Sequence, residues 1–562
     1  MRYNPQNPMI VQSDRTVLLE VDNAAYESAR DELARFAELE KSPEHIHTYR
    51  ITALSLWNAA ASGIQAKHVL DTLERYTKYD VPQNIIAEIE DYISRYGRVK
   101  LTKQDGGLVL SADEPALIAE IAHSQPVKNL LGEQLDAHSV SVPSHLRGHL
   151  KQALIKIGFP VEDLAGYVHG KFLQISPRDI TRTGLDFSLR DYQREAAEVF
   201  YAGGDSRGGS GVIVLPCGAG KTIVGLGSMF RTKCYTLILS TTTIAVRQWI
   251  EELHDKTTIS ADDVGEYTGE RKEIRPITVT TYQILTYRKN KSDNFVHLGL
   301  FSEMDWGLII YDEVHLLPAP VFRMTAEIQA RRRLGLTATL VREDGQEDDV
   351  FSLIGPKKYD VPWKELEAQG WIATAECTEI RVDLPDDLRM EYAIAGSRQK
   401  FRVASENPRK FQIVHALIDR HRGDQVLVIG QYINQLNEIS ARLNAPLITG
   451  QTSNVDRAKL YEQFRQGEIG LLVVSKVANF AIDLPDANVA IQISGTFGSR
   501  QEEAQRLGRI LRPKSDGSIA HFYSIVTRDS RDQEFAINRQ LFLTEQGYRY
   551  TIQYGDEYEP NM

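Results

Sequence analysis

The sequence predicts an α/β fold in which two lobes, each built on a parallel sheet, follow small α+β domains at the N-terminus. Seven short apolar runs between residues 211 and 494 alternate with helical patterns. Continuous apolar runs rich in β-branched residues are typical of parallel sheets that are buried on both faces. A stretch around residues 363–410 separates the runs into two groups, which favours two lobes over one oversized sheet.

The runs of the first group are GVIVLP, YTLILS, ITVTTY and GLIIYD, and those of the second are VLVIG, GLLVVS and VAIQIS. A chain of 562 residues is long enough for several domains, since one domain typically takes about 100 to 200 residues. We expect the first lobe to span residues 186–362, a linker with an insertion to span 363–410, and the second lobe to span 411–562.

The first 125 residues read as a separate unit. TVLLEV predicts a strand, NAAYESARDELARFAEL predicts a helix, and three further amphipathic stretches are broken by Gly63, Pro82 and Gly97. RVKLTKQDGGLVLSA then predicts a hairpin that turns at residues 105–107. Three helices followed by a hairpin resemble a winged helix.

The last helix of a winged helix often enters the DNA major groove, where it presents basic and amide side chains. Here that helix carries Glu88, Glu90 and Asp91 against a lone Arg95. Because phosphate repels an acidic face, a protein-facing or structural role is favoured over DNA contact.

A second small unit is expected at residues 126–185. Its helix PSHLRGHLKQALIKIG carries Arg147, Lys151 and Lys156, and Gly158 follows as a C-terminal stop. A basic helix is usually a solvated face, and weak DNA contact is the alternative.

Composition excludes several classes of protein. The net charge of −11 means that nucleic acid must be bound through local basic patches. The 3 cysteines form no CxxC pair, so we expect neither a structural metal nor an iron–sulfur cluster. We expect the protein to work in a reducing compartment. The N-terminus lacks an export signal and the chain lacks a run of about 18 apolar residues, so we expect a cytoplasmic protein without membrane contact.

The segment IVLPCGAGKTIVG places a glycine turn between a buried strand and a helix. Backbone N–H groups of such a turn and the helix dipole together attract an anion, most plausibly a nucleotide phosphate. In the Walker A pattern Lys221 reaches the phosphates and the Thr222 hydroxyl binds Mg²⁺, although Leu215 stands where that pattern has its first glycine. A turn that only packs closely is the alternative. The expected nucleotide-binding residues of the turn are Leu215, Pro216, Cys217, Gly218, Ala219, Gly220, Lys221 and Thr222.

A carboxylate pair ends the GLIIYD strand. Asp312 is placed to hold Mg²⁺ through water, and Glu313 is placed to orient and deprotonate the water that attacks the γ phosphate. Hydroxyls at Thr337 and Thr339, in RLGLTAT, can bridge to His315 and couple hydrolysis to movement.

Basic residues recur at helical spacing in EEAQRLGRILRP. Gln505, Arg506, Arg509 and Arg512 recur at intervals of three and four residues, so the guanidinium groups fall on one helix face. We expect Arg509 and Arg512 to cancel charge on the γ phosphate in the transition state, with Gln505 in the same catalytic group. Because they lie in the second lobe, ATP is expected between the lobes.

These motifs in order resemble superfamily 2 helicases, and specifically the xeroderma pigmentosum group B (XPB) family. The matching segments are LRDYQ, LPCGAGKT, DEVH, TAT, SKVANFAIDLP and QRLGRILRP. Arg342, Glu343 and Asp344 look like that family's RED motif, and the segment from PMIV to YGRVKL resembles its N-terminal domain. The similarity extends over nearly the whole chain, with a looser match at residues 126–185.

The resemblance implies RecA-like lobes and an ATP-driven, Mg²⁺-dependent motor that moves 3′ to 5′ on DNA and separates strands in nucleotide excision repair. It implies that Gln193 contacts adenine, that Arg190 flanks the base and that the RED residues help to open the duplex. It also implies a damage-recognition-like domain at 126–185.

A thumb-like insertion is also implied. Residues 388–410 hold six basic and two acidic residues, so that Arg398, Lys400 and Arg402 could grip the phosphate backbone. Lys476, Asn479 and Asp483 occupy the motif expected to connect ATP to DNA.

The ANF residues before Ala481 and the short segment after the second lobe look like the compact prokaryotic branch, for which partnership with a nuclease is plausible. Three functions stay open: a DNA helicase, a double-strand DNA translocase that does not unwind, and an ATP-gated scaffold that opens DNA for a nuclease. RNA is a weaker candidate substrate because no stacking-aromatic signature appears.

Overall fold

The computed structural model describes residues 3–558 except for 43–44, 105–106, 206, 217, 289–295, 298, 330, 339–346, 362, 372–373, 476–486, 496–518, 546–547 and 549. Within this part, no helix is both long and apolar enough to cross a bilayer.

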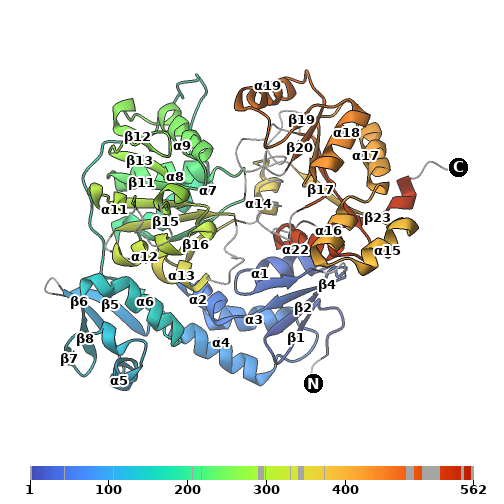
Figure 1. Ribbon diagram of the computed structural model, residues 1–562. Helices are drawn as coiled ribbons and strands as arrows, with labels where there is room; N and C mark the ends of the chain where they lie inside the picture. Colours follow the sequence, from blue (N-terminus) through green and yellow to red (C-terminus); the bar gives the residue numbers. More distant parts are fainter. Residues whose placement is uncertain are drawn as a thin grey trace.

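Two seven-stranded sheets, each with all its strand pairs parallel, form the centres of two lobes (Figure 1). The first sheet has the order β12-β13-β11-β14-β15-β10-β16. Its strands are β10 (Ser210–Val214), β11 (Thr236–Ser240), β12 (Val264–Tyr267), β13 (Ile277–Thr281), β14 (Leu308–Asp312), β15 (Arg332–Thr337) and β16 (Lys357–Asp360). Its main helices are α7 (Asp191–Tyr201), α8 (Lys221–Thr232), α9 (Thr243–Lys256) and α12 (Ala319–Glu327).

The second sheet has the order β19-β20-β18-β21-β22-β17-β23 and is also parallel throughout. Its strands are β17 (Ala375–Val382), β18 (Val426–Gly430), β19 (Leu447–Ile448), β20 (Leu471–Ser475), β21 (Val489–Gln492), β22 (Ala520–Thr527) and β23 (Tyr550–Tyr554). Its main helices are α17 (Arg409–Arg420), α18 (Ile433–Leu443), α19 (Asn454–Arg465) and α22 (Arg531–Glu545). The predicted fold class is therefore confirmed.

Each of the seven apolar runs forms a strand, and successive residues face opposite cores. In β10, Ile213 joins one buried cluster while Val212 and Val214 join the other. A strand that is buried on both faces favours apolar residues on both, which is why most of these runs read as continuous in the sequence.

The N-terminal domain contains an antiparallel sheet in the order β1-β2-β4-β3. Its elements are β1 (Met9–Val11), β2 (Thr16–Glu20), α1 (Tyr26–Leu33), β3 (Glu38–Lys41), β4 (Ile46–Arg50), α2 (Ala53–Ala61), α3 (Ala66–Tyr76) and α4 (Gln83–Arg95). The expected strand and helices are present, and β3 and β4 complete a sheet that the sequence did not reveal.

The expected hairpin, β5 (Val99–Gln104) and β6 (Gly107–Ala112), belongs to a different sheet from the three helices before it. It pairs with β8 (Ser139–Val142) and β9 (Val161–Asp163), and β7 (Gln134–Asp136) completes the sheet. The apolar cores also separate here, since Ile89 is the last buried residue that the first core takes from this part of the chain and Val99 is the first residue of the next core. This arrangement differs from a winged helix, and we propose that the first domain boundary lies near residue 97.

The basic helix α6 (Arg147–Lys156) is packed and not solvated as expected, because two of its cations are buried beside one carboxylate. Asp163 accepts from Arg147 Nε at 3.0 Å and Nη2 at 2.7 Å, and lies 3.1 Å from Lys151 Nζ. Lys151 Nζ also donates to Gln329 Oε1 of the first lobe at 3.0 Å. Burial lowers the pKa of Lys151 to about 8, although Asp163 opposes the shift.

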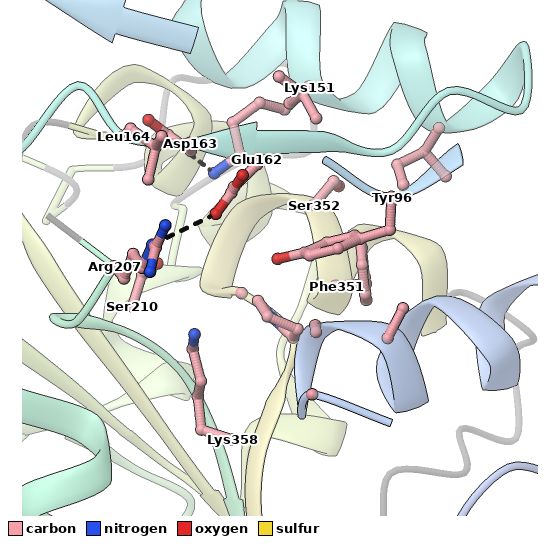
Figure 2. Close-up of a pocket in the computed structure, with 17 residues that line it drawn as sticks. Tyr96, Lys151, Glu162, Asp163, Leu164, Arg207, Ser210, Phe351, Ser352 and Lys358 are labelled. Atoms are coloured by element: carbon pink, nitrogen blue, oxygen red, sulfur yellow. Dashed lines mark ion pairs between the residues drawn. The ribbon is translucent and has the colours of Figure 1, made fainter. Parts of the chain in front are cut away.

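Figure 2 shows the cavity beside this cluster, where the two small domains meet the first lobe. It has a volume of about 220 Å³ and is lined by Tyr96, Glu162, Arg207 and Lys358 among others. Arg207 Nε lies 3.7 Å from Glu162 Oε1 across it. Ser210 in its lining begins β10, whereas the phosphate turn follows the end of that strand, so we assign the cavity to the domain junction and not to the nucleotide.

The N-terminal domain contacts both lobes and lies below them in the view of Figure 1. On the first lobe, the backbone N–H of Lys357 donates to Asn58 Oδ1 at 3.0 Å, and the Trp57 ring lies 6.5 Å from the ring of Phe351. On the second lobe, Leu541 of α22 is buried in the core of the N-terminal domain.

We expect Asp163→Asn to destabilise the junction between the small domain and the first lobe. The change leaves Arg147 and Lys151 buried without their carboxylate, which typically costs about 3–5 kcal/mol. Thermal unfolding and limited proteolysis of residues 164–186 measure the effect. Adding Lys151→Met should recover part of the loss, and Asp91→Asn, which breaks the partly exposed pair with Arg95, is the control. An unchanged melting temperature for Asp163→Asn would contradict the expectation.

Candidate active site

The turn between β10 and α8 has the backbone shape that a phosphate-binding turn requires. Gly218 and Gly220 have φ angles of +83° and +80°, in the left-handed region that favours glycine. Lys221 is the first residue of α8, so the free N–H groups of the helix start face the turn. Leu215, in place of the usual first glycine, is fully buried and its N–H donates to the carbonyl of Thr337 at 2.9 Å. That position therefore packs the turn onto the sheet.

Two side chains at the start of α7 support this turn. Gln193 Nε2 donates to the Ala219 carbonyl at 3.0 Å, and the Tyr192 hydroxyl donates to the same oxygen at 2.6 Å. Gln193 Oε1 accepts from the backbone N–H of Arg190 at 3.0 Å. Gln193 thus holds the turn through its amide, and its contact with adenine stays a prediction.

Asp312 ends β14 with its carboxylate held from one side. Trp249 Nε1 and Ser240 Oγ each donate to Asp312 Oδ2 at 3.0 Å. The Tyr282 hydroxyl donates to the Asp312 carbonyl at 2.8 Å. Burial and the neighbouring Glu313 raise the pKa of Asp312 to about 6, while Trp249, Lys221 and Ser240 act in the opposite direction.

Glu313 follows in a strained backbone conformation, with a φ of +51°. Its Oε1 lies 3.2 Å from Lys221 Nζ, and its Oε2 lies 3.5 Å from His315 Nδ1. Strain of this kind is often retained where function needs a side chain in one position. Here it aims the carboxylate at the phosphate turn.

His315 connects this pair to the next strand. Its Nδ1 lies 2.6 Å from the Thr337 hydroxyl, and both residues are buried. Lys221, Glu313, His315 and Thr337 therefore form one continuous set of polar contacts from the turn to the end of β15.

The structure brings together Gln193, Arg190, Leu215, Pro216, Gly218, Ala219, Gly220, Lys221, Thr222, Asp312, Glu313, His315 and Thr337 at the carboxyl edge of the first sheet. Other predicted residues lie outside the described part of the chain, and their roles stay predictions. They are Cys217, Thr339, Arg342, Glu343, Asp344, Lys476, Asn479, Asp483, Gln505, Arg506, Arg509 and Arg512.

Sequence reasoning missed Trp249, Ser240, Tyr282 and Tyr192. A signal existed for Ser240, since it ends the TLILS strand just as Asp312 ends LIIYD, and parallel neighbours end at one edge. Nothing in the sequence aims the indole of Trp249, which arrives from α9.

The thumb-like segment forms α15 (Asp386–Ile394) and α16 (Ser397–Ser405), and it offers fewer free cations than the sequence suggests. Arg402 Nε lies 2.7 Å from Glu406 Oε2. Lys410 lies 2.6 Å from Asp532 with both side chains 1% exposed, so it cannot meet DNA. Arg398 stays exposed, and Lys400 lies half-buried over the ring of Tyr392 at 5.5 Å.

Two RecA-like sheets, a glycine–lysine turn and a strand-end carboxylate pair define the class: a helicase-type ATPase core. Sequence comparison with known proteins identifies the family within this class. The chain is 54% identical to the DNA 3'-5' helicase XPB of Kineococcus radiotolerans over 98% of this chain and 97% of that protein. It is 55% identical to the protein of the same name from Mycobacterium tuberculosis, over 98% of each chain.

A eukaryotic relative from Encephalitozoon cuniculi is 34% identical over 97% of this chain and 82% of its own length. It is named General transcription and DNA repair factor IIH helicase/translocase subunit XPB. The family described as ERCC3/RAD25/XPB C-terminal helicase matches residues 366–558. Type III restriction enzyme, res subunit, matches 186–342, and Helicase conserved C-terminal domain matches 9–136. The chain belongs to the XPB family.

We expect Asp312→Asn to stabilise the nucleotide-free protein at pH 8. Because the folded pKa of Asp312 is raised to about 6, folding ionised Asp312 costs free energy above pH 6, and the cost disappears as the pH falls toward 4. An asparagine oxygen can still accept from Trp249 and Ser240, so the gain should be about 1–2 kcal/mol.

Thermal unfolding in EDTA at pH 8 and pH 5 measures this gain. The control is Asp305→Asn, whose carboxylate is 64% exposed beside Arg331. A loss of stability at pH 8 equal to that at pH 5 would contradict the charge argument.

Proposed function

We propose that this protein is an ATP-dependent DNA helicase that moves 3′ to 5′ and opens duplex DNA during repair of the nucleotide excision type. The observation that carries the proposal is the pairing of Lys221 with Glu313 at 3.2 Å, beside a glycine turn at a helix start. The activity of the two bacterial relatives, as their names give it, supports the choice of nucleic acid and direction.

The residues of the first lobe divide the chemistry between them. The turn N–H groups and Lys221 bind the phosphates, and a phosphate that pairs with Lys221 releases Glu313 from its ion pair. The Glu313 carboxylate is held in place by its backbone and by His315. It can then accept a proton from the attacking water.

The described residues also fit a magnesium ion. The two side-chain hydrogen bonds to the Asp312 carboxylate, within the described part, both end on Oδ2, which leaves Oδ1 for a cation or its water. The Thr222 hydroxyl lies in the first turn of α8, next to Lys221. When bound, Mg²⁺ would neutralise charge on the β and γ phosphates.

Movement on DNA requires that ATP hydrolysis at the phosphate site change the conformation of other parts of the molecule. The contact between His315 and Thr337 leads from Glu313 to the end of β15, directly before residues 339–346. We propose that this contact couples hydrolysis to the RED residues Arg342, Glu343 and Asp344. Arg509 and Arg512 from the second lobe are proposed to complete the site.

A second candidate is a double-strand DNA translocase that moves without separating strands. The name of the Encephalitozoon cuniculi relative includes both helicase and translocase. Both candidates use the same ATP residues. Strand release from a labelled fork supports the helicase, whereas triplex displacement without strand release supports the translocase. A partner nuclease is a further proposal, and unwinding that appears only when the nuclease is added would favour a scaffold role.

We expect Glu313→Gln to lower the DNA-stimulated ATPase rate at least about 100-fold while ATP still binds, because the general base is lost and the phosphate contacts remain. Lys221→Ala should weaken ATP binding and abolish fork unwinding. Turnover is measured with single-stranded, duplex and forked DNA and with RNA. Glu270→Gln, at a carboxylate that is 70% exposed, is the control. Wild-type turnover that ignores nucleic acid would overturn the motor assignment.

We expect the double change of Arg398→Ala and Lys400→Ala to weaken DNA binding several-fold. The slope of the logarithm of the affinity against the logarithm of the salt concentration should fall by about one to two, because fewer counterions are released from the phosphates. Arg402→Ala should have a smaller effect because Glu406 already neutralises that guanidinium. Fluorescence anisotropy at several salt concentrations compares the variants. Equal losses for Arg402→Ala and the double variant would refute a specific contact by Arg398 and Lys400.

A further inference from the structure

We propose that Trp371 is a positioning residue for the base of ATP. Its indole supports one face of the Arg190 guanidinium, and the opposite face stacks on adenine. This inference rests on the proposed function, because it concerns the same nucleotide site.

The first observation is the stack itself. The central carbon of the Arg190 guanidinium lies 4.3 Å from the ring centre of Trp371, the shortest cation–aromatic distance in the described part of the chain. The two residues are 181 positions apart, so tertiary structure alone creates the contact. A planar guanidinium can stack on an aromatic ring on each of its faces.

The second observation places Arg190 beside the phosphate turn. Its Nη1 donates to the Tyr192 hydroxyl at 3.2 Å, and that hydroxyl donates to the Ala219 carbonyl at 2.6 Å. The guanidinium is therefore two hydrogen bonds from the turn, within reach of a nucleotide whose phosphates occupy it.

The third observation is that no carboxylate pairs with Arg190 within 4.0 Å among the residues that the structure describes. The neighbouring Asp191 pairs with Arg194 at 3.1 Å instead. Because the indole covers one face and leaves the positive charge unneutralised, the other face is suited to an electron-rich planar base.

Two hydrogen bonds hold Trp371 against Arg190 although the residue is 36% exposed. Its backbone N–H donates to the Leu366 carbonyl at 2.8 Å, and its Nε1 donates to Gln369 Oε1 at 3.1 Å. It lies between α14 (Trp363–Ala368) and β17, on the connection between the lobes. A residue of the connection thus orders a side chain of the nucleotide site.

The test measures binding of a fluorescent ribose-modified ATP to the full-length protein, together with steady-state ATPase rates on forked DNA. For Trp371→Ala we expect the Kd of the analogue and the KM for ATP to rise about fivefold, with kcat changed less than about twofold. Trp371→Phe should restore values within about twofold of wild type, because phenylalanine keeps an aromatic face.

Inorganic tripolyphosphate, which has no base, separates positioning of the base from damage to the phosphate turn. Its inhibition constant should be the same for wild type and Trp371→Ala. The matched control is Tyr554→Ala, which removes a 41% exposed ring stacked by Arg528 at 5.7 Å on the second lobe, and it should change nothing.

An unchanged Kd and KM in Trp371→Ala would overturn the inference, as would equal weakening of tripolyphosphate. Failure of Trp371→Phe to restore binding would also overturn it. Wild-type protein that neither binds the analogue nor hydrolyses ATP would instead overturn the proposed function, so the two failures are distinguishable.

Discussion

The site depends on the ion pair between Lys221 and Glu313, and that pair depends on the order of three parallel strands. β14, β15 and β10 are consecutive neighbours in the first sheet, and all end at one edge. Lys221 follows β10, Glu313 follows β14, and Thr337 ends the strand between them. Parallel pairing therefore brings a cation, a carboxylate and a hydroxyl from distant segments into one contact set.

The same arrangement places a local cost on the fold. Two adjacent carboxylates are partly removed from water, and burial with mutual repulsion raises the pKa of Asp312. The hydrogen bonds from Trp249 and Ser240 stabilise the ionised form, so they lower the pKa of Asp312 against the effect of burial. The acidic pair and its supports therefore belong together, and the apolar residues behind them provide the compensating stability.

The sequence predicted the interior strands and the chemistry at their ends, because strands buried on both faces are rich in apolar residues and glycine is favoured at positive φ. It missed the edge strands. β16 is KKYD and β12 is VGEY, short segments with polar residues that an edge position tolerates. β17 mixes polar and apolar residues and fell within the expected linker.

Contacts between distant segments of the chain also could not be predicted from the sequence. The hairpin β5–β6 has the pattern of a wing, but only pairing with β8 and β9 decides to which sheet it belongs. Arg147, Lys151 and Lys410 read as surface charges, because their partners Asp163 and Asp532 are identified only by tertiary structure. The indoles of Trp249 and Trp371 reach the nucleotide site from separate parts of the chain for the same reason.

The N-terminal domain constrains how the two lobes can move, because it contacts both. In its contact with the first lobe, the backbone N–H of Lys357 donates to Asn58 Oδ1 and the Ser62 hydroxyl donates to the Lys357 carbonyl, while Trp57 packs on Phe351. Its contact with the second lobe includes Leu541 of α22, an apolar contact that lacks the direction of a hydrogen bond. Oriented hydrogen bonds resist sliding more than an apolar contact does. A change in the angle between the lobes should therefore leave the N-terminal domain with the first lobe and alter its contact with α22.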